Sequence, residues 1–85
     1  MEIGLTHFEY QYLCHAPFLT DDLRKTLFAS ETHDDMFLLK ISQDQADELR
    51  DLCGEQLQLV GFDAKYNPTS EGKLLESLID KFYAG

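Results

Sequence analysis

Basic side chains are scarce in this sequence, and their scarcity argues against one large class of partner. Seven Lys and Arg residues stand against sixteen Asp and Glu residues, which gives a formal net charge of −9 over 85 residues. Nucleic acid phosphates are bound by clustered Lys and Arg, whereas the basic residues here are few and scattered. We therefore expect no direct binding to nucleic acid.

Long apolar runs are also missing. No stretch approaches the roughly 20 apolar residues that a membrane-spanning helix needs. The first residues, Met1, Glu2 and Ile3, lack the basic segment that opens a secretory signal peptide. We therefore expect a cytoplasmic protein without a membrane partner.

Cysteine is too sparse for a disulfide scaffold, since only Cys14 and Cys53 are present. Both fall on faces predicted to be buried, where free cysteine behaves as a small hydrophobic residue. The histidines, His7, His15 and His33, show no close pairing with cysteine at the spacing of a zinc site. We therefore expect no metal centre.

Motifs that would carry chemistry are lacking as well. The glycines stand apart from one another, so no glycine-rich phosphate loop is present. The predicted helix N-termini are occupied by their own acids, which disfavours anionic ligands there. No serine is arranged with His and Asp as a nucleophile, and a small core leaves little room for a shaped catalytic pocket. We expect a protein that is not an enzyme and holds no cofactor.

What the chain does contain is enough apolar material for one core, with 44% hydrophobic and 12% aromatic residues. Disordered chains combine high charge with low hydrophobicity, and this one does not. The length suits one domain, so we expect residues 1–85 to form a single globular unit.

Local patterns predict the elements of the first half. Aromatic residues alternate with mainly polar ones from Thr6 to Cys14, which indicates a half-buried strand ending before Pro17. Thr20 can cap a short helix over residues 21–29, and acids follow it in the first turn. Residues 30–35 are typical of a polar loop, and the apolar run 36–41 predicts a second strand.

The second half reads as two helices. Ser42 and Gln45 match a capping box that begins the first of them. It ends either at Gly54, leaving residues 56–62 as a strand, or at Gly61, with a Schellman cap in which Leu57 meets Phe62. We favour the longer helix. Thr69 or Ser70 caps the last helix, which shows a clear apolar stripe at helical spacing, formed by Leu74, Leu75, Leu78, Ile79 and Phe82.

These elements predict an α+β fold of order β-α-β-α-α, in which the C-terminal helix pair covers two strands. Because two strands alone rarely form a stable sheet, a second copy of the chain is the other way to complete it. A homodimer formed through the edge of the 36–41 strand is therefore an alternative to helix cover.

Two features are candidates for partner binding. Acids at helical spacing form a stripe on the helix after Ser42, and its members are Asp44, Asp47, Asp51 and Glu55. Tyr66 lies in the connection before the last helix, where it either packs under the loop or is exposed as an anchor for a partner.

The negative charge and the absence of catalytic motifs favour a protein that binds another, basic protein as an inhibitor or regulatory adaptor. A self-associating structural homodimer is one alternative. An acidic mimic of nucleic acid, presenting the stripe on the helix after Ser42, is the other.

Overall fold

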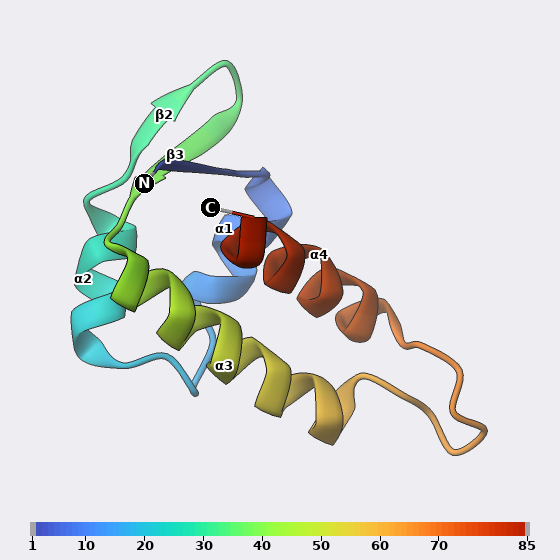
Figure 1. The fold of residues 1–85 in the computed structure, drawn as a ribbon. Coiled ribbons are helices and arrows are strands. Elements are labelled where there is room, and N and C mark those ends of the chain that lie inside the picture. Colours follow the sequence, from blue (N-terminus) through green and yellow to red (C-terminus); the bar gives the residue numbers. More distant parts are fainter. Residues whose placement is uncertain (1, 85) are drawn as a thin grey trace.

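In a computed structural model, which describes residues 2–84, the elements follow the order β-α-α-β-β-α-α (Figure 1). The strands are β1 (Glu2–Leu5), β2 (Glu31–His33) and β3 (Met36–Lys40). The helices are α1 (His7–Cys14), α2 (Asp21–Phe28), α3 (Gln43–Val60) and α4 (Ser70–Ala84). The α+β class is confirmed, whereas the predicted order β-α-β-α-α is wrong in the first half of the chain.

The segment predicted as the first strand is helix α1. Thr6 caps it, since Thr6 Oγ1 accepts from the Glu9 N–H at 3.2 Å and Glu9 Oε1 accepts from the Thr6 N–H at 2.8 Å. This reciprocal capping box fixes the first helical turn. Glu9 and Leu13, four residues apart, then face the interior, while the Tyr10 ring stacks on Phe37 of β3 with centroids 3.8 Å apart. The alternation of aromatic residues was thus a misleading signal.

The sheet has three antiparallel strands in the order β1-β3-β2. In its register, Ile3 of β1 lies opposite Leu39 of β3. Strand β2 lies in the segment predicted as a loop, and Asp34 and Asp35, at φ 50° and 67°, form the tight turn to β3. Two consecutive left-handed residues are typical of a type I′ hairpin. Both neighbours of β3 come from the chain itself, so completing the sheet does not require a second copy.

Helices α3 and α4 pack along each other as an antiparallel pair (Figure 1). The capping box between Ser42 and Gln45 is present, and α3 continues to Val60, which confirms the longer helix. The predicted Schellman cap is wrong, because Gly61 has a right-handed φ of −75°. The close approach at this end of the helix pair depends on Gly72, because a Cβ atom added to Gly72 would overlap the Gly61 backbone.

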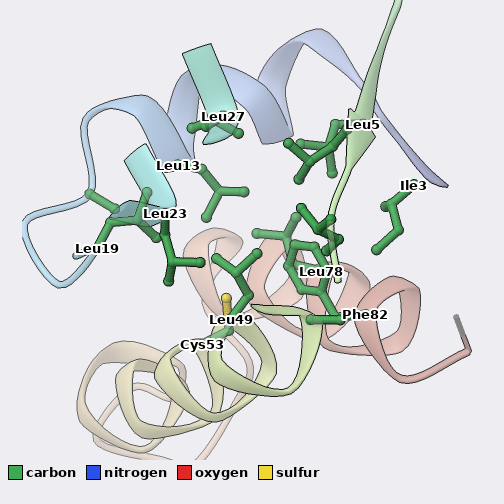
Figure 2. Close-up of a cluster of buried hydrophobic side chains, with 14 of the residues drawn as sticks. Ile3, Leu5, Leu13, Leu19, Leu23, Leu27, Leu49, Cys53, Leu78 and Phe82 are labelled. Carbon is green, nitrogen blue, oxygen red and sulfur yellow. The ribbon is translucent and has the colours of Figure 1, made fainter. Parts of the chain in front are cut away.

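One cluster of buried side chains joins the four helices to β1 and β3, and its members point toward one another in Figure 2. Its largest fully buried residues are Phe82, Leu5, Leu13, Leu27, Leu39, Leu75, Leu78 and Cys53. Helices α1 and α2 pack directly on β3, which the prediction of two strands covered by the C-terminal helix pair did not include. Within residues 2–84, no helix is long and apolar enough to cross a membrane.

Candidate protein-binding surface

The connection between α3 and α4, residues 61–69, projects from the end of the helix pair (Figure 1, orange). Asp63 organises its tip. The Asp63 Oδ1 atom accepts from the backbone N–H groups of Lys65 at 2.8 Å and Asn67 at 3.0 Å, and the Asp63 N–H donates to Asn67 O at 2.9 Å. A short aspartate side chain that satisfies nearby amides in this way stabilises a turn.

Thr69 holds the base of the same connection. Its N–H donates to Gly61 O at 2.8 Å, and its hydroxyl donates to Val60 O at 2.9 Å. The hydroxyl oxygen also accepts from the Gly72 N–H at 2.9 Å, so Thr69 is the N-cap of α4. The connection is therefore fixed at its tip and at its base.

Tyr66 lies at the tip. Its φ of 63° is in the left-handed region, which residues with a Cβ adopt rarely, and its N–H donates to Asp63 O at 3.0 Å. The side chain is 86% exposed, so it does not pack beneath the connection. Of the two alternatives for Tyr66, the exposed one agrees with the structure.

Two other apolar side chains are exposed at this end of the helix pair. Leu59, in the last turn of α3, is 78% exposed, and Phe62 is 44% exposed. We call Leu59, Phe62 and Tyr66 the apolar tip. Large apolar side chains grouped on a surface often mark a site of interaction with another molecule.

The acidic stripe of Asp44, Asp47, Asp51 and Glu55 lies along one face of α3. Asp47 is half-buried and has partners on its own helix, because its Oδ1 accepts from Gln43 Nε2 at 3.0 Å and lies 3.6 Å from Arg50. The other members are exposed. The stripe is thus a solvated helix face that adds to the negative potential, and Tyr66 lies beyond the C-terminal end of its helix.

A groove of about 540 Å³ lies between α1, the turn after it, and the facing ends of α3 and α4. Its lining includes the rings of Phe8, Tyr12 and Phe18, the imidazole of His15 and the carboxylate of Glu71. We call this site the aromatic groove. The Tyr12 hydroxyl donates to Glu71 Oε2 at 2.5 Å. Burial, and then this hydrogen bond, raise the pKa of Tyr12, which therefore remains a neutral donor.

The aromatic groove was not predicted from the sequence, because residues 6–14 were predicted to form a strand. Tyr12 and Glu71 are 59 positions apart in the chain, and only the packing of α1 beside α4 brings them together. The available signal was the capping box formed by Thr6 and Glu9, which marks a helix start within the alternating segment.

A second polar cluster lies inside the protein around Glu9, which is 2% exposed. Lys81 Nζ donates to Glu9 Oε1 at 2.5 Å and to Gly4 O at 3.0 Å. Ser77 Oγ donates to Glu9 Oε2 at 3.0 Å. Burial raises the pKa of Glu9, but the hydrogen bonds from Lys81, Thr6 and Ser77 outweigh it and leave the pKa below its ordinary value. A buried, ionised carboxylate whose oxygens are both engaged joins α1, β1 and α4, and it is poorly placed to transfer protons to a substrate.

The cysteines and acids form no metal centre in the part of the chain that the structure describes, because no cluster of three or more potential ligands occurs there. Cys53 is buried in the core, and burial raises the pKa of its thiol to about 12. Cys14 is half-buried. Neither thiol has the exposed, cationic surroundings that activate a nucleophile.

Comparison with protein-family models, with curated proteins and with solved structures yields no match. The function therefore has to follow from the chemistry of the apolar tip and the aromatic groove.

Proposed function

We propose that this chain is a non-enzymatic cytoplasmic protein that binds a basic protein as an inhibitor or regulatory adaptor, with the apolar tip as its anchor. The observation that carries the proposal is Tyr66, held 86% exposed on a left-handed residue of a hydrogen-bonded turn. Left-handed backbone at a residue with a side chain costs free energy, and such positions concentrate at functional sites.

The physical argument is one of preorganisation. A tyrosine presents a large, rigid contact area, and tyrosine is enriched among residues that dominate binding free energy. The hydrogen bonds of Asp63 and Thr69 order the connection before a partner arrives, so less conformational entropy is lost on binding. The net charge of −9 attracts a basic partner and accelerates the encounter.

The test is affinity capture from the native host at low and moderate salt, followed by measurement of the Kd for the captured protein. We expect a basic protein whose Kd rises at least ~10-fold for Tyr66→Ala, because truncation of a hot-spot residue costs about 2 kcal/mol or more. Tyr83→Ala is the matched control, since Tyr83 is 74% exposed but lies on α4 outside the apolar tip.

The same experiment also tests the electrostatic attraction between the chain and its partner. Binding should weaken as salt rises, because electrostatic attraction between a basic partner and an acidic chain is screened. Equal Kd values for Tyr66→Ala, Tyr83→Ala and the natural sequence would contradict the assignment of the apolar tip. Failure to capture any protein in a salt-sensitive manner would contradict the proposed function itself.

A further inference from the structure

The aromatic groove has the composition of a site for an organic cation. Phe8 is 79% exposed, and the rings of Tyr12 and Phe18 lie beside each other with centroids 6.3 Å apart at an angle of 51°. The faces of aromatic rings carry negative electrostatic potential and attract cations, most strongly when water is partly excluded. Tyr12 and Phe18 are half-buried, so a cation beside them is partly shielded from water.

The charges around the groove also favour a cation as its ligand. Glu71 is the one carboxylate among the described residues that line it. The lining contains no Lys or Arg, and its one basic side chain is the exposed imidazole of His15. Glu71 Oε2 accepts from the Tyr12 hydroxyl, which orients the carboxylate and leaves Oε1 without a partner among residues 2–84. The chain as a whole carries a net charge of −9, which adds to the attraction for a cation and repels an anion.

We propose that the aromatic groove binds an arginine side chain of a protein partner, with the guanidinium against the aromatic rings and paired with Glu71. A guanidinium is flat, stacks on aromatic rings and is weakly hydrated, and it donates directed hydrogen bonds to a carboxylate. A lysine ammonium is more strongly hydrated and loses more on leaving water. The volume of about 540 Å³ is within the usual range for ligand pockets.

This assignment rests on the proposed function in one respect, that the partner is a basic protein. The position of the groove suits such a partner. Gln56 lines the groove and precedes Leu59 of the apolar tip by less than one helical turn, and Glu71 opens α4 on the other side of the same connection. A partner anchored at the apolar tip therefore has the groove within reach.

The test uses short capped peptides and needs no knowledge of the partner. Acetyl-Gly-Arg-Gly-amide is titrated into the 15N-labelled protein and followed by NMR, beside peptides with lysine or citrulline in place of arginine. Citrulline keeps the shape of arginine without its charge. We expect saturable shifts at α1, at the turn after it and at the start of α4, with binding ~10-fold weaker for citrulline and several-fold weaker for lysine, as expected for about 1–2 kcal/mol from a cation–π contact and a charged hydrogen bond.

Variants identify the groups responsible. Glu71→Gln removes the charge but keeps an oxygen that can accept from Tyr12, and its control is Glu55→Gln, the same change on an exposed face of α3. Phe8→Ala is compared with Phe28→Ala, whose ring is 60% exposed on α2 outside the groove. Both groove variants should weaken the arginine peptide ~10-fold, and both controls should leave its affinity within about twofold, as is usual for residues outside the contact.

Equal binding of the citrulline peptide, or shifts that do not saturate or do not map to the groove, would overturn the arginine assignment. The two proposals fail separately. A captured partner that depends on Tyr66 while the arginine peptide does not bind would leave the proposed function standing and remove the groove from it. Specific binding of the peptide with no Tyr66-dependent partner would support the aromatic groove as a site for arginine and contradict the proposed role of the apolar tip.

Discussion

Glu9 is tolerated in the interior because groups from several elements compensate its loss of hydration. Lys81 of α4 supplies the counter-charge, Ser77 donates a second hydrogen bond, and the Thr6 N–H donates a third. Burying a carboxylate without such partners costs several kcal/mol, and removing one partner of a buried pair leaves the other charge uncompensated. At the scale of single residues, this cluster is the part of the molecule most sensitive to the loss of one charge.

Glu9→Gln should therefore be strongly destabilising. We expect a loss of about 2–4 kcal/mol in the free energy of unfolding at pH 7, since Lys81 is then left partly buried beside a neutral amide. Urea denaturation measures the loss, and Glu55→Gln, an exposed acid, should change stability by less than about 0.5 kcal/mol. The interpretation of Glu9 as a structural anchor would be wrong if the two variants were equally stable.

The same variant has a predicted pH profile. The pKa of Glu9 is lowered in the folded protein from an ordinary value of 4.5, so its ionised form stabilises the fold above that pH. This contribution is lost as the pH falls through the lowered pKa. The difference in stability between the natural sequence and Glu9→Gln should consequently shrink below about pH 4.5 and remain constant from pH 6 to 8.

At the scale of elements, two glycines in helices have opposite roles. Gly54 lies inside α3 with open space where a Cβ atom would be, whereas Gly72 lies in the first turn of α4 against the backbone of Gly61. Gly54 has no packing reason to lack a side chain. Gly72 permits the close contact that joins the ends of the two longest helices.

Alanine at each glycine should accordingly shift the melting temperature in opposite directions. Gly54→Ala should stabilise by about 0.5–1 kcal/mol, because a glycine inside a helix costs conformational entropy. Gly72→Ala should destabilise by about 2 kcal/mol or more, because its Cβ would overlap backbone that cannot move as a side chain can. Thermal unfolding followed by circular dichroism compares them, and a change of the same sign for both would contradict the close-approach role.

Local signals predicted the helices α2, α3 and α4 because each begins at a side-chain cap and presents apolar residues at helical spacing. The same kind of signal existed for α1, but the alternation of aromatic residues obscured it. Phe8, Tyr10 and Tyr12 do not share one buried face: Phe8 is exposed, Tyr10 stacks on β3, and Tyr12 bonds to Glu71. A periodic pattern predicts an element correctly only when burial in one core is its cause.

At the scale of the whole molecule, Cys53 lies inside the core, so the reactivity of its thiol measures global unfolding. Cys53 is fully buried, and burial raises the pKa of its thiol to about 12. A thiol reagent therefore meets neither an accessible sulfur nor a thiolate until the core opens.

We expect a disulfide reagent at pH 8 to label Cys14, which is half-buried, well before Cys53. In a Cys14→Ser variant, labelling of Cys53 should follow the global unfolding equilibrium as urea is added. Mass spectrometry of the labelled protein measures both rates. Rapid labelling of Cys53 without denaturant would show that the helix pair opens locally.

The α+β class, the long helix of α3 and the amphipathic stripe of α4 could be predicted from the sequence because caps and periodic burial are local properties. Strands β1 and β2 could not, since a strand is stable only beside a partner, and the side chains of β2 are all exposed and carry no hydrophobic pattern. The exposure of Tyr66 and the aromatic groove were likewise decided by tertiary structure. Tyr66 depends on the turn that Asp63 closes, and the groove forms only where α1 packs beside the first turns of α4.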